Sequence, residues 1–425
     1  MPQIPFVLPS VFRAERSPEF FQTMPVIVEA EPTLNANMLA GKVAVKINAE
    51  IGKTIDSMNM FSAIIPTGLV DDLASVEGVR SISLDRRHYA FAAPPLPTLP
   101  GIKATIDGFV PTSEAIKRVN IPALHASGIT GKNVKVAVLD TGIDLANPQI
   151  QGAAVKLSTM KAFPTGDDEN GHSTWCCTCI KGRRFVDDIT GLIAQGGAPE
   201  CILTSIKVLG YGIGTGMTSD IMEAIELAVN QGNKVISMSL GSEGSDDEDN
   251  DPMVRMINQY AVDHPDVIFC IAAGNSGPAD KTIGIPGCAE KAVTVGSLSA
   301  IDGLPAYFSS RGPTIQSGLP KPCIMGLGGG RANENFKPKE NIWSGTSLGS
   351  LLDGMDKAIN GFTAIAGTSM ATPQVAAVMA LWKQQYPDLT SDIAKGIFKV
   401  MGKPHDNMTG FGLIDALWIE NITTK

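Results

Sequence analysis

The stretch VKVAVLDTG at residues 134–142 carries the two features that decide the fold. Its first part, Val134–Leu139, is mainly branched and apolar, which is typical of a strand buried on both faces of a parallel sheet. Asp140 follows at the carboxyl end of that strand, where α/β proteins hold their active sites. Asp140 is therefore a candidate functional residue, although an isolated aspartate there is more often a helix cap or a turn residue.

The same alternation continues beyond about residue 114. Further apolar runs are expected to be strands: Ile202–Val208, Val235–Leu240, Val267–Ala273 and Ala292–Val295. Ser219–Asn230 has the spacing of an amphipathic helix, and Met370–Gln385 is apolar enough for a buried one. This pattern predicts an α/β domain over residues 114–425, with a mainly parallel sheet covered by helices on both faces.

The first quarter of the chain has a different organisation. Strand-like runs at residues 25–30, 42–47, 59–65 and 79–84, with helical spacing at 69–76, predict a small α+β domain over residues 24–91. Residues 1–23 lack clear periodicity and are expected to form an extended N-terminal arm. The proline-dense segment AAPPLPTLP, residues 92–100, predicts an exposed connector that spans 92–113.

Composition excludes several classes of function. With 44% hydrophobic residues the chain of 425 can bury a large core and is not disordered overall. A net charge of −9 argues against nucleic acid as a partner, and no apolar run reaches the ~18 residues that cross a bilayer. The N-terminus does not resemble a secretory signal. Because three of seven cysteines crowd into Cys176–Cys179, a disulfide framework is not expected, which favours the cytoplasm or release by an unrecognised route.

Three more polar residues lie at expected ends of strands or starts of helices. His172 (in ENGHST) precedes a short helix, and Asn275 (in AAGNSG) follows an apolar strand. Ser369 (in AGTSMATP) begins the buried helix, where its hydroxyl and its own N–H can face a developing oxyanion. Each alone has a plain structural explanation. Together with Asp140 they give the order Asp, His, amide donor and Ser, which is the order of subtilisin.

Residues 115–420 resemble the subtilisin-like serine proteases (subtilases, peptidase S8 family). The segments that carry the resemblance are Val136–Asp144, Ser237–Gly241, Ala272–Gly277, Phe308–Pro313 and Gly367–Pro373. Residues 24–91 more loosely resemble the inhibitor-like propeptide that precedes many secreted subtilases. A second Gly-Thr-Ser triplet ends at Ser347 but lacks the following helix start, so Ser347 is not the expected nucleophile.

The resemblance implies a serine endopeptidase that acts on polypeptides through an acyl-enzyme and is made as a self-processed precursor. Ser369 would be the nucleophile, His172 the base and then the acid, and Asp140 the group that orients the imidazole. Asn275 and the Ser369 N–H would bind the oxyanion. The implied substrate-binding residues are Ser239, Leu240 and Gly241 on one edge and Gly212 and Gly214 on the facing edge.

The resemblance also implies partners and cofactors. The propeptide would inhibit its own catalytic domain until a cut within Tyr89–Thr112 releases it. No cofactor is required for the chemistry. Calcium, common in such enzymes, is left open, because its usual loop is not recognisable in Lys181–Gly197.

One motif departs from the family pattern. The usual His-Gly-Thr-His reads His172–Ser173–Thr174–Trp175 here, which puts the packing behind His172 in doubt. The spacing of His172, Cys176 and Cys179 would also suit a metal site, but buried thiols explain these cysteines better.

The acidic run Glu243–Asp251 follows the expected substrate strand and is most simply a solvated loop. The alternative is that it attracts basic residues near the scissile bond.

Two other classes of protein remain as alternatives. A catalytically impaired subtilase fold that binds or supports a partner is favoured by the altered histidine motif and opposed by the complete set of Asp, His and Ser. An unrelated α/β hydrolase or nucleotide-binding protein ranks last, because no Gly-x-Ser-x-Gly elbow surrounds Ser369 and no phosphate-binding Gly-Lys-Ser/Thr loop occurs.

Overall fold

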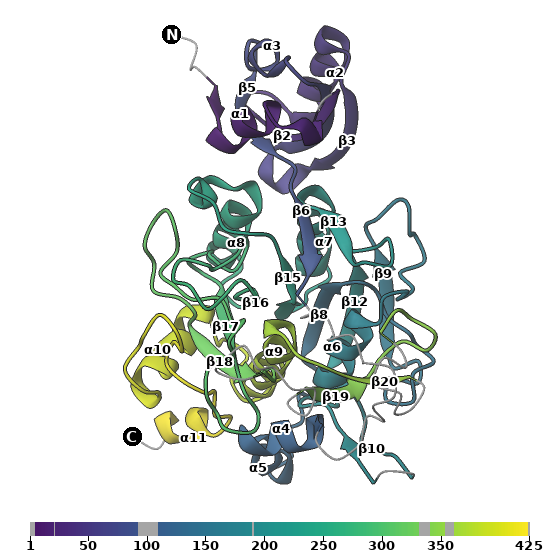
Figure 1. The fold of residues 1–425 in the computed structure, drawn as a ribbon, viewed down its shortest axis with the longest axis vertical. Helices are drawn as coiled ribbons and strands as arrows, with labels where there is room; N and C mark the ends of the chain where they lie inside the picture. The colour runs from purple at the N-terminus through teal and green to yellow at the C-terminus, as the bar shows by residue number, and fades with distance from the viewer. Residues whose placement is uncertain are drawn as a thin grey trace.

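A computed structural model describes residues 5–20, 22–91, 109–188, 191–330, 341–352 and 361–423. The chain forms a small N-terminal part that sits on a larger α/β domain, and one strand, β6, runs from the first into the second (Figure 1).

The larger domain is built on a seven-stranded sheet with the order β18-β17-β16-β14-β8-β12-β9. Every neighbouring pair in it is parallel. The strands are β8 (Lys135–Asp140), β9 (Ala154–Ser158), β12 (Ile202–Lys207), β14 (Val235–Met238), β16 (Ile268–Ala272), β17 (Val293–Leu298) and β18 (Ile324–Leu327). The predicted α/β class with a mainly parallel sheet is therefore confirmed.

Both faces of this sheet are covered. One core contains Val136 and Val138 of β8, and the other contains Ala137 and Leu139, because successive side chains of a strand point to opposite faces. The first core packs against α4 (Thr112–Arg118), α5 (Ile121–Ala126), α6 (His172–Lys181), α9 (Thr368–Gln385), α10 (Ser391–Met401) and α11 (Trp418–Thr423). The second packs against α7 (Thr218–Asn230) and α8 (Pro252–Asp263).

Close packing brings α9 onto the sheet. The helix is buried from Thr368 to Lys383, as its apolar sequence predicts, and its alanines allow a short distance to the strands. A Cβ on Gly326 of β18 would lie 2.6 Å from the carbonyl oxygen of Ala371. This contact fixes the start of α9, and with it Ser369, against the carboxyl edge of the sheet.

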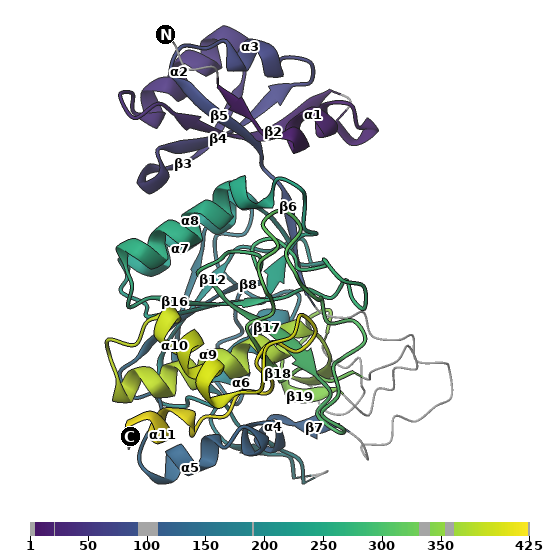
Figure 2. The same ribbon diagram turned by 90° about the vertical axis from the view of Figure 1, so that its left-hand side faces the viewer.

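The N-terminal part has its own sheet with the order β1-β5-β2-β4-β3 and its own core. Its elements are β1 (Phe6–Val7), α1 (Pro9–Glu15), η1 (Pro18–Phe20), β2 (Thr23–Ala30), α2 (Ala36–Ile47), β3 (Glu50–Ile55), η2 (Asp56–Met58), β4 (Met60–Pro66), α3 (Val70–Ala74) and β5 (Val79–Leu84). The side view shows α2 and α3 on the outer face of this sheet, while its other face lies over α7 and α8 (Figure 2).

Two expectations for this part are wrong in detail. Residues 42–47 belong to helix α2, not to a strand: Val43 and Ile47 are buried, whereas Val45 is 87% exposed, a difference that period-two alternation forbids. Residues 6–20 do not form an extended arm, because β1 pairs with β5 and α1 follows. Short elements such as these give little periodicity from which to predict them.

The remaining strands form smaller sheets. They are β6 (Arg87–Ala90) between β13 (Thr215–Met217) and β15 (Leu240–Gly241), β7 (Val110–Pro111) with β19 (Ile342–Gly345) and β20 (Phe362–Ile365), and β10 (Phe185–Val186) with β11 (Ile193–Ala194). Most of the expected connector lies outside the described residues, and its last residues begin β7 and α4.

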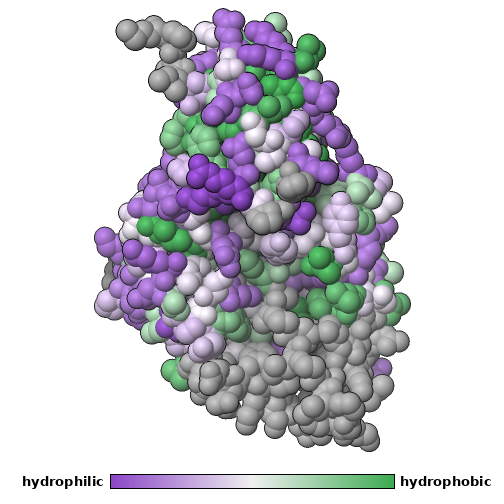
Figure 3. Space-filling view, turned by 45° about the horizontal axis from the view of Figure 1, so that its top comes forward, coloured by the Kyte–Doolittle hydropathy of each residue, from purple (hydrophilic) through white to green (hydrophobic). Residues whose placement is uncertain are grey.

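The surface view shows hydrophobic residues in separate patches among hydrophilic ones (Figure 3). Among the described residues, none of the helices combines the length and apolar character needed to span a bilayer. All seven cysteines are buried and free.

Candidate active site

Three elements bring the candidate residues to one edge of the large sheet. Asp140 is the last residue of β8, His172 the first of α6, and Ser369 lies in the first turn of α9. All three side chains are fully buried. Gly171 precedes α6 with a φ of 97°, a conformation that glycine adopts at little cost and that turns the chain sharply into the helix.

Asp140 and His172 form a close pair. Nδ1 of His172 lies 2.8 Å from Oδ1 and 3.0 Å from Oδ2 of Asp140. The carboxylate can accept a hydrogen bond only from a protonated Nδ1, so this pair leaves Nε2 as the ring nitrogen that is free to take a proton. Among the described residues Nε2 has no hydrogen-bond partner.

The Ser369 hydroxyl lies at the same edge but bonds elsewhere. Its Oγ donates to the carbonyl oxygen of Ser239 at 3.0 Å. The same carbonyl accepts from the backbone N–H of Phe91 at 3.2 Å. The hydroxyl of Ser369 and the backbone N–H of Phe91 therefore share one acceptor. Ser239, which supplies it, lies between β14 and β15.

The side chain of Asn275 bonds to both Thr368 and Phe91. Its Oδ1 accepts from the N–H of Thr368 at 3.0 Å and from the Thr368 hydroxyl at 2.9 Å. Because two donors occupy the oxygen, the amide nitrogen must point the other way. There Nδ2 donates to the carbonyl oxygen of Phe91 at 2.8 Å. The side chain is thus oriented to donate to a carbonyl in the cleft.

A carboxylate that sequence reasoning missed ties these elements together. Asp168 accepts from Thr141 Oγ1, from the N–H groups of Asn170 and Gly171, and from both the N–H and the hydroxyl of Thr174. It therefore joins the loop after Asp140 to the start of the helix that carries His172. Asp168 stands four residues before α6, outside the N-cap position held by Gly171, so the sequence gives no clear signal of this role.

A buried lysine supports the same loop. Nζ of Lys207, whose side chain is not exposed, donates to the carbonyl oxygens of Thr141 and Asp167 and pairs with Glu169 at 2.6 Å. A lysine that ends a strand gives no signal of this role in the sequence.

The departure at Trp175 does not disturb the imidazole. The buried indole donates from Nε1 to the carbonyl oxygen of Thr363 in β20 at 3.3 Å, while His172 keeps its bond to Asp140. The serine in the usual glycine position, Ser173, is also accommodated: its N–H donates to Thr141 Oγ1 at 3.0 Å.

The metal-site alternative takes a different form from the one expected. Asp140, His172 and Cys176 bring ligand atoms within 4.8 Å of one another, and Cys179 does not belong to this group. Nδ1 of the imidazole already faces the carboxylate, and burial raises the pKa of the Cys176 thiol well above its ordinary value. A neutral thiol is a poor metal ligand, so these residues do not fit a metal ion.

Calcium finds no ligand set in the segment where it was left open. The described residues of Lys181–Gly197 form the end of α6 and the β10–β11 hairpin, with no cluster of three carboxylate, thiol or imidazole groups. Calcium in proteins is also held by backbone and amide carbonyls, so its binding stays a prediction.

The cleft beside these residues holds a strand of the protein itself. Strand β6 pairs antiparallel with β13 on one side and with β15 on the other. On the expected substrate edges, Leu240 and Gly241 pair with Ala90 and Tyr89, and Gly214 accepts from the N–H of Ala90 at 3.0 Å. Gly212 lies on the same loop, where its carbonyl accepts from Asn170.

Phe91 enters a recess floored by glycine. A Cβ on Gly241 would lie 2.5 Å from Cζ of the Phe91 ring, and one on Gly284 would lie 3.5 Å from it. Only a residue without a side chain at position 241 leaves room for this ring. The recess therefore holds a large aromatic side chain, and the backbone N–H of the same residue shares the Ser239 carbonyl with the Ser369 hydroxyl.

The junction between the two parts is both apolar and charged. Ile27, Ile55 and Met60 join the core that covers α7 and α8. Glu29 forms a two-pronged ion pair with Arg255 of α8, at 2.8 and 3.0 Å. Burial alone would raise the pKa of Glu29, but hydrogen bonds from Arg255 and Ser81 hold it below its ordinary value.

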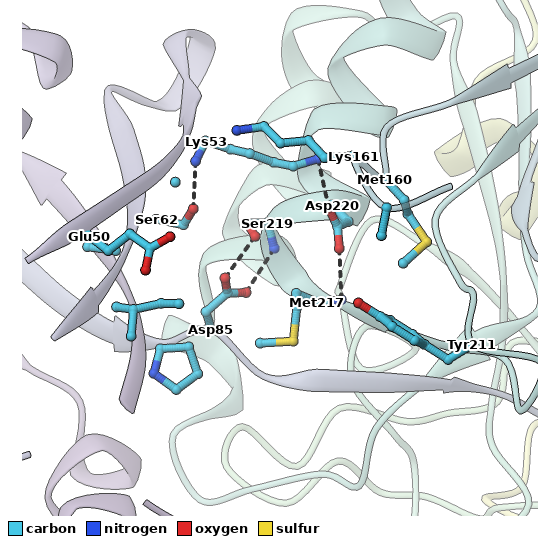
Figure 4. Close-up of a pocket in the computed structure, with 15 residues that line it drawn as sticks. Glu50, Lys53, Ser62, Asp85, Met160, Lys161, Tyr211, Met217, Ser219 and Asp220 are labelled. Carbon is cyan, nitrogen blue, oxygen red and sulfur yellow. Dashed lines mark hydrogen bonds and ion pairs between the residues drawn. The ribbon is translucent and has the colours of Figure 1, made fainter. Parts of the chain in front are cut away.

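A cavity of about 290 Å³ opens at the junction (Figure 4). In it Asp85 points at Ser219 and accepts from its N–H at 2.9 Å and its hydroxyl at 2.7 Å, at the start of α7. Lys53 pairs with Asp220 at 2.7 Å. Burial raises the pKa of Asp85 to about 7, with a smaller contribution from the charge of Asp220.

The acidic run was expected to be a solvated loop, and this is wrong for its central residues. Asp247, Glu248 and Asp251 are buried, and η3 (Glu248–Asn250) lies among them. The physical reason is that each of these carboxylates accepts backbone N–H groups: Asp247 from Ser10, Glu248 from Ile315 and Gln316, and Asp251 from Met253 and Val254.

Comparison with known proteins supplies a family context. The family model of Peptidase S8, the subtilase family, matches residues 131–400. Serine protease AprX of Bacillus subtilis (strain 168) is 33% identical, over 94% of this chain and 89% of the relative. Subtilisin Savinase of Lederbergia lenta is 32% identical, over 71% of this chain and 96% of the relative.

A solved structure agrees in fold. Fervidolysin from Fervidobacterium pennivorans, described as a keratinolytic enzyme related to subtilisin, superposes with a TM-score of 0.71 at 20% identity. The match covers 94% of this chain, which spans 61% of the fervidolysin chain.

Proposed function

Because the chain belongs to the subtilase family and is a serine-type endopeptidase, we propose that Asp140, His172 and Ser369 are its catalytic triad and that its first substrate is its own N-terminal part. The observation that carries the proposal is the position of Phe91. Its carbonyl oxygen accepts from Asn275, and its N–H shares the Ser239 carbonyl with the Ser369 hydroxyl. The Phe91–Ala92 bond is therefore the bond to be cut, within the expected segment Tyr89–Thr112.

The chemistry follows from the donors and acceptors present. Ser369 Oγ leaves the Ser239 carbonyl, gives its proton to Nε2 of His172 and attacks the carbonyl carbon of Phe91. Asn275 Nδ2, with the Ser369 N–H in the first turn of α9, stabilises the oxyanion. His172 then protonates the amine of Ala92, while Asp140 keeps Nδ1 protonated. Water next attacks the acyl-enzyme, with His172 as base, and frees the Phe91 carboxylate and Ser369.

Residues 6–91 then act as an inhibitor of the cleft in which they were cut. Three observations support this role: β6 pairs on both sides with the cleft strands, Phe91 fills the glycine-floored recess, and the junction buries apolar and charged groups. Polypeptide substrates would add to the same edges as an extended strand once the N-terminal part leaves. The recess favours a large aromatic or aliphatic residue before the scissile bond.

Labelling with a fluorophosphonate tests the nucleophile directly. The processed protein is expected to take up one phosphonyl group on Ser369, identified by peptide mass spectrometry, and to lose all peptidase activity as it does so. An impaired subtilase that only binds partners would remain unlabelled while folded, and that result would overturn the proposed function.

Release of the N-terminal part is expected to depend on pH through Asp85. Its pKa is about 7 when buried against Ser219 and about 3.8 when free, so the attached state holds the proton more tightly. Attachment is therefore strongest at low pH and weakens as pH rises, by up to about tenfold per unit, until about pH 7. Above about pH 7 Asp85 is ionised in both the attached and the free state, so attachment no longer changes with pH through this group. The opposite contribution of Glu29 changes only below its ordinary pKa of 4.5, which is below the pH range of 5 to 8 measured next.

Gel filtration of the self-cleaved complex at pH values from 5 to 8 measures this release, in the wild type and in Asp85→Asn. Asparagine keeps an acceptor for Ser219 but does not titrate. The dissociated fraction should rise with pH in the wild type and stay flat in the variant. Equal slopes in both proteins would assign the pH dependence to a group other than Asp85.

A further inference from the structure

Arg86, the residue before β6, is held by two buried carboxylates. Its Nη2 lies 3.0 Å from Oδ1 of Asp247 and its Nε lies 3.3 Å from Oδ2 of Asp251. Nη2 also lies 3.3 Å from the hydroxyl of Ser245. The side chains of Asp247 and Asp251 are only 3% and 1% exposed, and that of Arg86 is 16% exposed. The guanidinium of Arg86 is thus largely buried and is paired with two carboxylates.

The two carboxylates are fixed by the larger domain itself. Asp251 caps α8, where its Oδ1 accepts from the N–H groups of Met253 and Val254, and its Oδ2 faces Arg86. Asp247 accepts from the hydroxyl of Ser245 at 2.6 Å. These bonds do not involve residues 1–91. Each carboxylate therefore retains hydrogen bonds from the larger domain when the N-terminal part leaves.

When the N-terminal part leaves, Asp247 and Asp251 lose the guanidinium of Arg86 with which both form ion pairs. Asp247 loses Arg86 and the N–H of Ser10, and Asp251 loses Arg86. Among the described residues Oδ2 of Asp251 has no hydrogen bond, and its ion pair is with the guanidinium of Arg86. Two carboxylates left together in a recess repel each other and favour a new positive charge between them.

The strand register says which substrate residue would supply that charge. Counting Phe91 as the first residue before the scissile bond, Arg86 is the sixth. We propose that Asp247 and Asp251, with Ser245, form a substrate subsite that selects an arginine six residues before the bond that is cut. This inference rests on the proposed function, because it assumes that substrates occupy the cleft in the register of β6.

The neighbouring arginine provides a contrast. Arg87, the fifth residue, is 63% exposed, and its nearest acid is Glu19 at 3.9 Å. Glu19 belongs to the N-terminal part and leaves with it. Position five should therefore show no preference for arginine, although a general attraction of the acidic protein for basic peptides would affect both positions alike.

Peptide substrates that copy the cleft-bound sequence test the subsite. The parent peptide carries residues 84–95 with a fluorophore and a quencher, and in its variants arginine at position six or position five is replaced by glutamine. With the processed enzyme at low salt, the change at position six should lower kcat/KM by about tenfold or more, as expected for a charged hydrogen-bonded pair. The change at position five should leave it within about twofold.

Enzyme variants separate the subsite from general electrostatics. Asp247→Asn and Asp251→Asn keep a side-chain oxygen that can accept backbone N–H groups, and each should erase most of the difference in kcat/KM between the parent peptide and the peptide with glutamine at position six. The matched control is Asp246→Asn, because Asp246 is exposed and pairs with Arg13 of the N-terminal part. Its preference should equal that of the wild type.

The outcomes are distinct. Cleavage of the parent and both glutamine peptides at equal rates would overturn the subsite and leave the protease proposal intact. A preference for arginine at both positions that Asp246→Asn also reduces would indicate a general electrostatic attraction of basic peptides and would overturn the subsite. Absence of cleavage of any peptide, with no labelling of Ser369, would overturn the proposed function instead.

Discussion

A chain with Ser369→Ala is expected to remain a single polypeptide of full length, whereas the wild type separates into two fragments. Self-cleavage should slow by on the order of 10⁶-fold, because the alanine leaves no oxygen to attack the carbonyl of Phe91. The fold should survive, because the hydroxyl bonds to the Ser239 carbonyl at the cleft while α9 is buried along its length by other residues. Intact-mass spectrometry after expression measures the outcome.

The second Gly-Thr-Ser triplet supplies the matched control. Ser347 ends the same three-residue sequence but lies in a loop after β19 rather than at the start of a long helix. Ser347→Ala should therefore be processed at the wild-type rate. Identical fragments from Ser369→Ala and the wild type would show that another protease makes the cut, and the assignment of Ser369 would be lost.

Removing the amide of Asn275 should be the next most damaging change. Asn275→Ala and Asn275→Asp are both expected to lower the rate of self-cleavage by about 10²–10³, since each removes the donor that faces the Phe91 carbonyl. The aspartate keeps acceptors for the N–H and hydroxyl of Thr368, so it preserves the local structure. The alanine leaves the Thr368 N–H without its acceptor and should also lower the free energy of unfolding by about 1–3 kcal/mol.

The comparison of these two variants separates catalysis from stability. First-order rates of cleavage and thermal melting curves are measured on the same preparations. Equal loss of rate with unequal loss of stability is the result that the oxyanion role predicts. A rate that follows the melting temperature, with Asn275→Asp close to wild type, would reduce Asn275 to a structural residue.

Long periodic elements of this fold could be predicted from the sequence, and short ones could not. The strand that ends at Asp140 and the helix that starts at Ser369 carry runs of apolar residues, which tertiary packing reinforces. The run at residues 42–47 was wrongly predicted to be a strand because valine and isoleucine are common in strands. The helix that forms instead is capped by Asn35 and buries every third or fourth residue. Residues 6–20 form pieces too short to show a period.

Candidate site residues could be proposed from the sequence where they stand at the ends of long apolar elements, and could not where loops distant in the sequence meet. Asp140, His172, Asn275 and Ser369 stand at ends of elements that apolar runs define. Asp168 and Lys207 owe their places to loops that only the folded chain brings together. The buried state of Asp247 and Asp251 was missed for the same reason, since an acidic run is polar by composition whatever its backbone donors do.

The central claim is that this chain cuts its own Phe91–Ala92 bond with Ser369, and one measurement tests it most directly. Freshly purified full-length protein is diluted over a hundredfold range, and fragments are weighed by intact-mass spectrometry over time. We predict fragments Met1–Phe91 and Ala92–Lys425, formed at a first-order rate that dilution leaves unchanged, because Phe91 already lies in the cleft of its own chain. Fragments that end elsewhere, or a rate that falls in proportion to concentration, would contradict the account.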